Sequence, residues 1–188
     1  AIASRDPQRI QRALSLELWP QALRQVPDYP ETYAMAEAEG LLAMGRAKEG
    51  KQRLAEIKAR LDKLDKPYPG GWSSSGCYFY FPCQLPGLMA DLAGVRAAEN
   101  DYLENAPKDA WADSSRRAAL AVAFARAGDA ERALHHLDVV VQMVGPFAYA
   151  SLSVVPGFDS LREEPRFKAM KTAYERWKAE RKQAAEGT

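Results

Sequence analysis

The sequence lacks the features that mark membrane spans and secretion. Its longest apolar run, Leu137 to Val144, is interrupted by Asp138 and Gln142, and it is far shorter than the roughly 20 residues that cross a bilayer. No basic segment followed by an apolar stretch and a small-residue cleavage site opens the chain, so the sequence predicts no signal peptide. We therefore expect no membrane insertion within this chain.

Cysteine and histidine are scarce, with two of each among 188 residues. Cys77 and Cys83 are six positions apart, which exceeds the Cys-x-x-Cys spacing of zinc sites, and no histidine lies nearby. The two cysteines either form a disulfide in an oxidising compartment, such as the periplasm, or remain thiols in the cytoplasm, which is the favoured location. His135 and His136 point about 100° apart on a helix, so one should face a neighbouring helix and the other solvent. We expect no metal site and no cofactor.

Charge of one sign is not in excess. The chain has 26 Lys and Arg against 25 Asp and Glu, a formal net charge of +1, and the two signs are interspersed as on solvated helix surfaces. The basic C-terminal helix is diluted by Glu175, Glu180 and Glu186, which favours a solvated cap over a surface for nucleic acid or lipid. The sequence therefore predicts no nucleic-acid partner.

Motifs of the common enzyme classes are missing. The segment 71–76, GWSSSG, places its two glycines five positions apart, whereas the Gly-x-Ser-x-Gly motif of serine hydrolases requires four. No glycine-rich phosphate loop is present. Carboxylates such as Glu37, Glu39, Glu163 and Glu164 occur in charge-mixed segments typical of solvated helix faces. We therefore expect that the chain is not an enzyme.

What the sequence does contain is typical of an all-α protein. Apolar residues make up 47% of it, helix-forming Ala, Leu, Glu, Arg and Lys are abundant, and β-branched residues are sparse outside 139–155. Pro20 should kink or split the first helix. Helices are predicted over 7–26, 31–44, 47–64, 84–94, 96–105, 112–127, 130–144, 159–163 and 166–184.

Two segments share one pattern on either side of a glycine turn. Residues 38–57, AEGLLAMGRAKEGKQRLAEI, align with residues 121–140, AVAFARAGDAERALHHLDVV. The alignment matches small Gly50 with small Ala133, which lets two helix backbones approach closely, and a leucine one turn later fills the remaining space. Each segment is therefore predicted to form a helical hairpin.

These offsets resemble the 34-residue tetratricopeptide (TPR) repeat. The match rests on Ala121, Phe124, Gly128 and Ala133 and, in the first copy, on Ala38, Leu41 and Gly45. The resemblance implies an α-α superhelix, a TPR-like solenoid of three to four hairpins, formed by a single domain over residues 1–188. Such arrays bind a protein or peptide partner in a concave groove.

The rest of the chain is interpreted as parts of the same array. Residues 88–107 are predicted to form a degenerate middle repeat, with Gly94 in the turn, Leu103 inside, and Glu99 at a position that usually holds alanine. Residues 65–84 are predicted to form an irregular, aromatic loop. The run from Phe158 to Phe167, FDSLREEPRF, resembles the closing element of C-terminal TPR arrays in bacterial kinases, cyclases and winged-helix regulators. That resemblance implies a C-terminal cap over 156–184.

The alignment also implies which residues line the groove. They are mostly small and apolar with one charge: Thr32, Met35, Glu39, Leu42, Ser115, Ala118, Val122 and Ala125. Because no Lys or Arg clamp for a terminal carboxylate is among them, an apolar or extended segment is the expected ligand. A second set consists of Trp72, Tyr78, Tyr80 and Trp111, which either add aromatic anchors or form the core of a distorted repeat.

The function implied by the resemblance is protein–protein interaction within a larger regulatory or signalling protein of bacterial type. The abrupt start at Ala1 leads us to expect that the chain is part of a longer protein. Two alternatives remain open. In the first, aromatic residues over 72–81 bind a small ligand, and the domain passes a shift to an attached output domain. In the second, the domain forms a homodimer that brings together two copies of its host.

Overall fold

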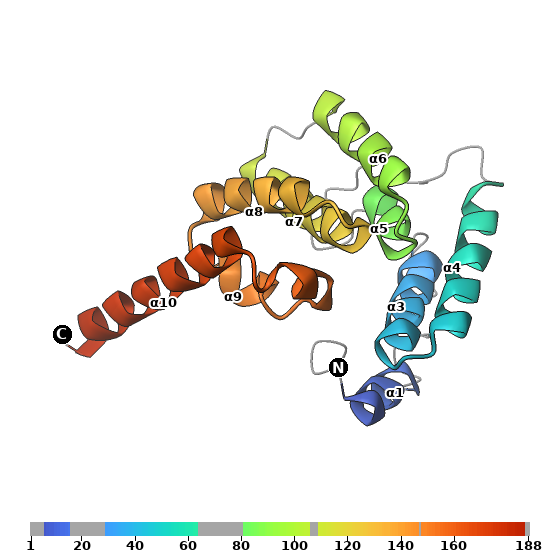
Figure 1. The fold of residues 1–188 in the computed structure, drawn as a ribbon, viewed down its shortest axis with the longest axis horizontal. Coiled ribbons are helices and arrows are strands. Elements are labelled where there is room, and N and C mark those ends of the chain that lie inside the picture. Colours follow the sequence, from blue (N-terminus) through green and yellow to red (C-terminus); the bar gives the residue numbers. More distant parts are fainter. Residues whose placement is uncertain (1–5, 16–28, 64–80, 106–108, 147, 187–188) are drawn as a thin grey trace. The chain divides into compact units, whose positions relative to one another are not determined.

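The computed structural model describes residues 6–15, 29–63, 81–105, 109–146 and 148–186. Every regular element in these ranges is helical, which confirms the predicted all-α class. The elements in chain order are α1 (Pro7–Ser15), α3 (Tyr29–Ala43), α4 (Ala47–Leu61), α5 (Phe81–Leu88), α6 (Leu92–Glu104), α7 (Ala110–Ala127), α8 (Ala130–Val144), α9 (Ala148–Leu152), the 3-10 helix η2 (Pro156–Leu161) and α10 (Pro165–Glu186) (Figure 1).

The chain divides into two compact units, Ala1–Ser75 and Gly76–Thr188. It therefore stays a prediction that the chain forms one continuous repeat domain with a superhelical arrangement. The same holds for the role of 156–184 as a cap on that array. The predicted loop over 65–84 ends earlier than expected, because residues 81–84 form the start of α5, and the rest of it lies outside the described residues. The second half of the predicted first helix, with Pro20, also lies outside them.

The first unit is centred on the antiparallel hairpin of α3 and α4, which α1 contacts through α3. Gly45 ends α3 with a φ of +77°, a backbone conformation that favours glycine. Gly50 lies where the helices approach, because an added Cβ would stand 2.8 Å from Leu42 Cγ and 3.1 Å from the Ala38 carbonyl oxygen. Leu54, Ile57 and Leu61 form the buried stripe of α4 (their 3- and 4-residue spacing places them on one face).

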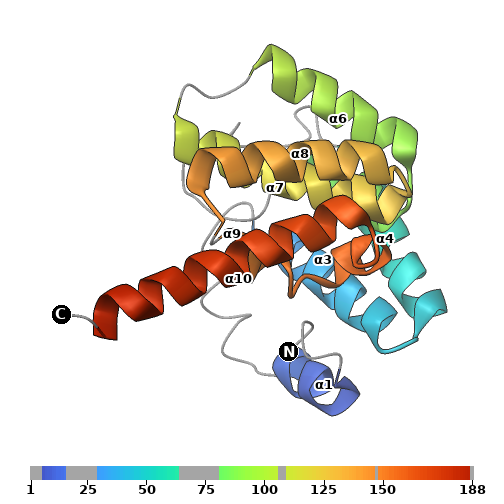
Figure 2. The same ribbon diagram turned by 60° about the vertical axis from the view of Figure 1, so that its left-hand side comes forward.

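The second unit is built around α7, which lies alongside its hairpin partner α8 (Figure 2). α7 also contacts α5, α6 and η2. Gly128 ends α7 with a φ of +87°, and the Asp129 amide donates back to the Phe124 carbonyl, as in a helix C-cap that uses a left-handed glycine. Gly87 of α5 lies against α7, because an added Cβ would stand 2.7 Å from Ala123 Cα. Both turns predicted at Gly45 and Gly128 are confirmed.

The predicted middle repeat is wrong in detail. The chain turns at residues 89–91, where Ala90 has a φ of +56°, and α6 already begins at Leu92. Gly94 therefore lies in the first turn of α6, where its amide donates to the Asp91 carboxylate over 3.0 Å, and an added Cβ would stand 2.6 Å from that carboxylate. Leu103 is 51% exposed, and Tyr102 takes the buried position instead.

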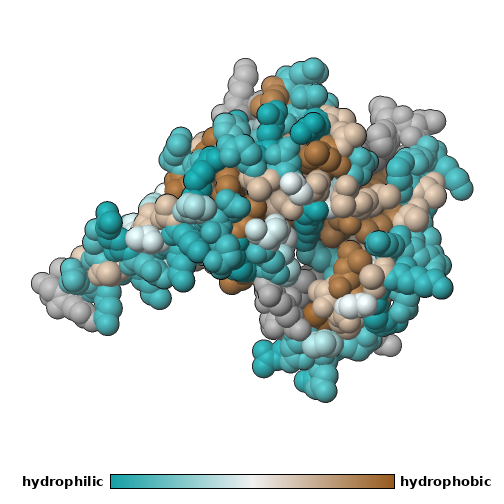
Figure 3. Space-filling view, in the orientation of Figure 1, coloured by the Kyte–Doolittle hydropathy of each residue, from teal (hydrophilic) through white to brown (hydrophobic). Residues whose placement is uncertain are grey.

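The C-terminal elements close the second unit. Phe158 and Leu161 of η2 and Phe167 of α10 are buried, and η2 contacts α7. Phe167 lies against Phe158 and Tyr149, with ring centroids 6.0 and 5.4 Å apart. α10 contacts α8 and α9 near its start, and its later turns carry a largely hydrophilic surface (Figure 3).

Candidate functional site

The groove residues predicted in the first unit lie on α3 and differ in accessibility. Met35 is buried, whereas Glu39 and Leu42 are half-buried. The side chain of Leu42 packs toward Gly50 of α4, so it contributes to the hairpin itself. Thr32 belongs to α3, but its side chain lies outside the described residues.

The groove residues predicted in the second unit lie on α7 at positions 115, 118, 122 and 125. Ala118, Val122 and Ala125 are buried, at 9%, 9% and 5% exposed, whereas Ser115 is half-buried. Val122 is covered by η2, because an added Cβ at Gly157 would stand 2.7 Å from Val122 Cγ1. The part of this face that remains accessible is therefore around Ser115.

The predicted aromatic set cannot be placed around a site. Trp72, Tyr78 and Tyr80 lie outside the described residues, and so does the side chain of Trp111 in α7. Cys77 also lies outside them, so the disulfide stays a prediction. Cys83 is buried in α5, and burial raises the pKa of its thiol well above the ordinary value, which keeps the thiol protonated.

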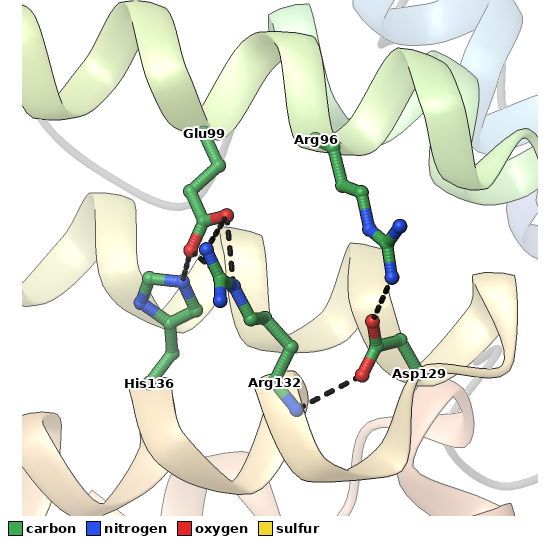
Figure 4. A network of polar contacts seen from close by, with 5 residues as sticks. All are labelled: Arg96, Glu99, Asp129, Arg132 and His136. Carbon is green, nitrogen blue, oxygen red and sulfur yellow. Dashed lines mark hydrogen bonds and ion pairs between the residues drawn. The ribbon is translucent and has the colours of Figure 1, made fainter.

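A polar network that the sequence did not predict joins α6 to α8 (Figure 4). Glu99 of α6 is 2% exposed and accepts hydrogen bonds from Arg132 Nε over 2.9 Å. Its Oε1 also accepts from His136 Nε2 over 2.9 Å. One turn earlier, Arg96 donates to the Asp129 carboxylate over 3.0 Å. Asp129 is the N-cap of α8, so the network holds the start of this helix against α6.

The two side chains that contact Glu99 differ in their exposure to solvent. The Arg132 side chain is 49% exposed, and its hydrogen bond and attraction to Glu99 raise its pKa. His136 is 1% exposed, and its ring stacks on Phe124 with centroids 5.7 Å apart. Burial lowers the pKa of His136 from 6.5, an effect that its hydrogen bond to Glu99 opposes. His136 is therefore neutral at pH 7, with its proton on Nε2, since a carboxylate can only accept.

One signal in the sequence pointed toward this network. Glu99 occupies a position where the repeat pattern has alanine, and its side chain is buried there. The prediction that one histidine faces a neighbouring helix and the other solvent is confirmed, because His136 is buried and His135 is exposed. The partners of Glu99 are 33 and 37 positions away, so only the packing of α6 against α8 identifies them.

Chemically, the network connects helices and offers little to a substrate, because Glu99 and His136 are both buried. Over the ranges that the structure describes, no three His, Cys, Asp or Glu side chains gather closely enough to hold a metal ion. The same ranges contain no helix with the length and apolarity of a membrane span. Comparison of the chain with protein-family models, with curated proteins and with solved structures finds no match.

Proposed function

We propose that this chain is a protein-binding module of stacked, TPR-like helical hairpins within a larger regulatory or signalling protein. The observation that carries the proposal is the packing of α7, which contacts both its hairpin partner α8 and the preceding α5. A groove lined by the first helices of successive hairpins requires those helices to be neighbours. The close approach of Gly87 to Ala123 supports this relation between α5 and α7.

The binding surface that this packing favours is narrower than the predicted groove. Because η2 covers Val122, the accessible part of the α7 face is the segment around Ser115. The small, half-buried side chain of Ser115 lets a partner's backbone approach the helix, which suits an extended or apolar segment. In the first unit the half-buried Glu39 is the corresponding accessible position on α3.

Site-specific photocrosslinking in the full chain tests this proposal. A photoreactive amino acid replaces Ser115 or Glu39 in two separate variants, and the exposed positions Gln142 of α8 and Lys51 of α4 serve as controls. After irradiation in cells, mass spectrometry identifies the crosslinked proteins. In the second unit we expect a partner at 115 that is absent at 142, and in the first unit, judged by itself, a partner at 39 that is absent at 51.

Two outcomes would count against this surface. Crosslinks to one partner at equal yield from all four positions would indicate non-specific contact. A partner captured only at Gln142 or Lys51 would place the binding surface on the second helices of the hairpins.

A further inference from the structure

The Glu99–His136 pair places an ionisable imidazole in the buried contact between α6 and α8. Both side chains are almost fully buried, and Nε2 of His136 is 2.9 Å from Oε1 of Glu99. The other ring nitrogen, Nδ1, is also buried, and no hydrogen-bond partner for it exists among the residues that the structure describes. A neutral imidazole tolerates this arrangement, because Nδ1 is then an acceptor that lacks only one hydrogen bond.

Charged groups approach His136 from each helix packed around it. From α6 comes the Glu99 carboxylate, and from α7 comes the positive field of Arg117, which forms an ion pair with Asp113 over 3.1 Å. α8 itself contributes Arg132 and the neighbouring His135.

The remaining charged contacts around α8 are already paired. Asp129 interacts with Arg96, and Arg166 of α10 pairs with Glu131 and Asp138. Among the residues that the structure describes, these pairs leave Glu99 as the anion in direct contact with His136.

A second proton on His136 would disturb this balance. Arg132 already neutralises Glu99, so an imidazolium adds an uncompensated positive charge to a buried contact. The new Nδ1–H donor would also lack an acceptor among the described residues, and an unmet donor on a charged ring costs more than an unmet acceptor on a neutral one. Protonation therefore favours a state in which water reaches the ring.

We propose that the Glu99–His136 contact makes the packing of α6 on the α7–α8 hairpin sensitive to acid, so that a state in which α6 has separated from the hairpin and His136 carries a second proton becomes more populated as pH falls. The packing responds to pH between neutral pH and about pH 5.5, the range in which an exposed histidine becomes charged. It does not depend on the chain having a protein partner.

The sign of the effect follows from the two protonation states. Burial lowers the pKa of His136 in the packed state, whereas an exposed histidine titrates near 6.5. The open state thus binds the proton more tightly, so the packed state is fully favoured above pH 6.5 and loses stability as pH falls below it. If the packed state stays unprotonated, the open-to-packed ratio at pH 5.5 is at most about tenfold that at pH 8.

Hydrogen–deuterium exchange of the full chain, read by mass spectrometry at pH 8, 7, 6 and 5.5, tests the proposal. Protection factors corrected for intrinsic exchange are compared for α6 peptides and for α3–α4 peptides, which serve as the internal reference. We expect the α6 protection factor to fall severalfold between pH 8 and pH 5.5. His136→Gln, which keeps an N–H donor for Glu99 but cannot become charged, should abolish the fall, and His135→Gln should preserve it.

A fall in α6 protection that is the same in wild type and His136→Gln would overturn the proposal, and so would no fall in wild type. Should His136→Gln not fold, the imidazole signals of the wild-type chain are followed by NMR with and without 8 M urea, with His135→Gln assigning them. The His136 midpoint must be lower in the folded chain than in urea. A His136 midpoint that is equal or higher in the folded chain than in urea would contradict the proposal.

Discussion

Replacing Glu99 with alanine removes the carboxylate on which the α6–α8 contact depends. The substitution leaves Arg132 and His136 without their shared acceptor. The two consequences differ, because the Arg132 side chain is 49% exposed and can turn toward water, whereas His136 is 1% exposed and cannot. The expected loss therefore comes mainly from the buried imidazole.

The magnitude follows from these exposures. Breaking a fully buried ion pair costs about 3–5 kcal/mol, but that figure applies only when both charges stay buried. Here the orphaned group is a neutral ring N–H, for which about 1–3 kcal/mol is typical. Some lost packing around the Glu99 side chain adds to this, so we expect Glu99→Ala to destabilise the second unit by about 2–3 kcal/mol.

The assay is native-state hydrogen exchange of α7 and α8, which reports the opening free energy of the second unit separately from the first. Glu104→Ala on the same helix is the matched control, because Glu104 is exposed, and it should change stability by less than about 0.5 kcal/mol. Equal effects of Glu99→Ala and Glu104→Ala would refute the structural role assigned to the network.

Two further substitutions test the packing of the second unit. Gly87→Ala places a Cβ 2.7 Å from Ala123 Cα, so thermal unfolding should show a loss of about 1–3 kcal/mol from overpacking; an unchanged melting temperature would contradict the close approach of α5 and α7. Phe158→Ala empties a fully buried site and should cost about 3–5 kcal/mol in urea unfolding, whereas Val154→Ala, at 54% exposed, should cost less than about 0.5 kcal/mol. Similar losses for Phe158→Ala and Val154→Ala would contradict the packing of η2 on α7.

The turns of the clear hairpins could be predicted from sequence because the signal is local. Gly45 and Gly128 end helices with φ of +77° and +87°, and glycine adopts such angles at little cost. Gly94 is also a glycine, so the sequence predicts a turn there, but its amide instead donates to the N-cap residue of α6. The turn passes through Ala90, and alanine is not a residue type that marks turns. The displaced turn led to the wrong buried residue, Leu103 instead of Tyr102.

The α7 face and the Glu99 network were less predictable from sequence, because both depend on which helices pack against one another. The spacing along α7 predicts that Ala118, Val122 and Ala125 share one face, but sequence periodicity does not reveal that η2 returns to cover Val122. The partners of Glu99 were equally hidden, since Arg132 and His136 lie more than 30 positions away. Both features arise from tertiary packing that no local pattern encodes.

Protein binding through the accessible face of α7 is the central claim, and one affinity comparison tests it most directly. The partner captured at position 115 is titrated with the wild-type chain, with Ser115→Arg, and with Gln142→Arg, which adds the same charge to an exposed position of α8. We predict that Ser115→Arg raises Kd by at least about tenfold, or about 1.4 kcal/mol, at an unchanged melting temperature, and that Gln142→Arg leaves Kd unchanged. Equal Kd values for all three proteins would contradict the claim.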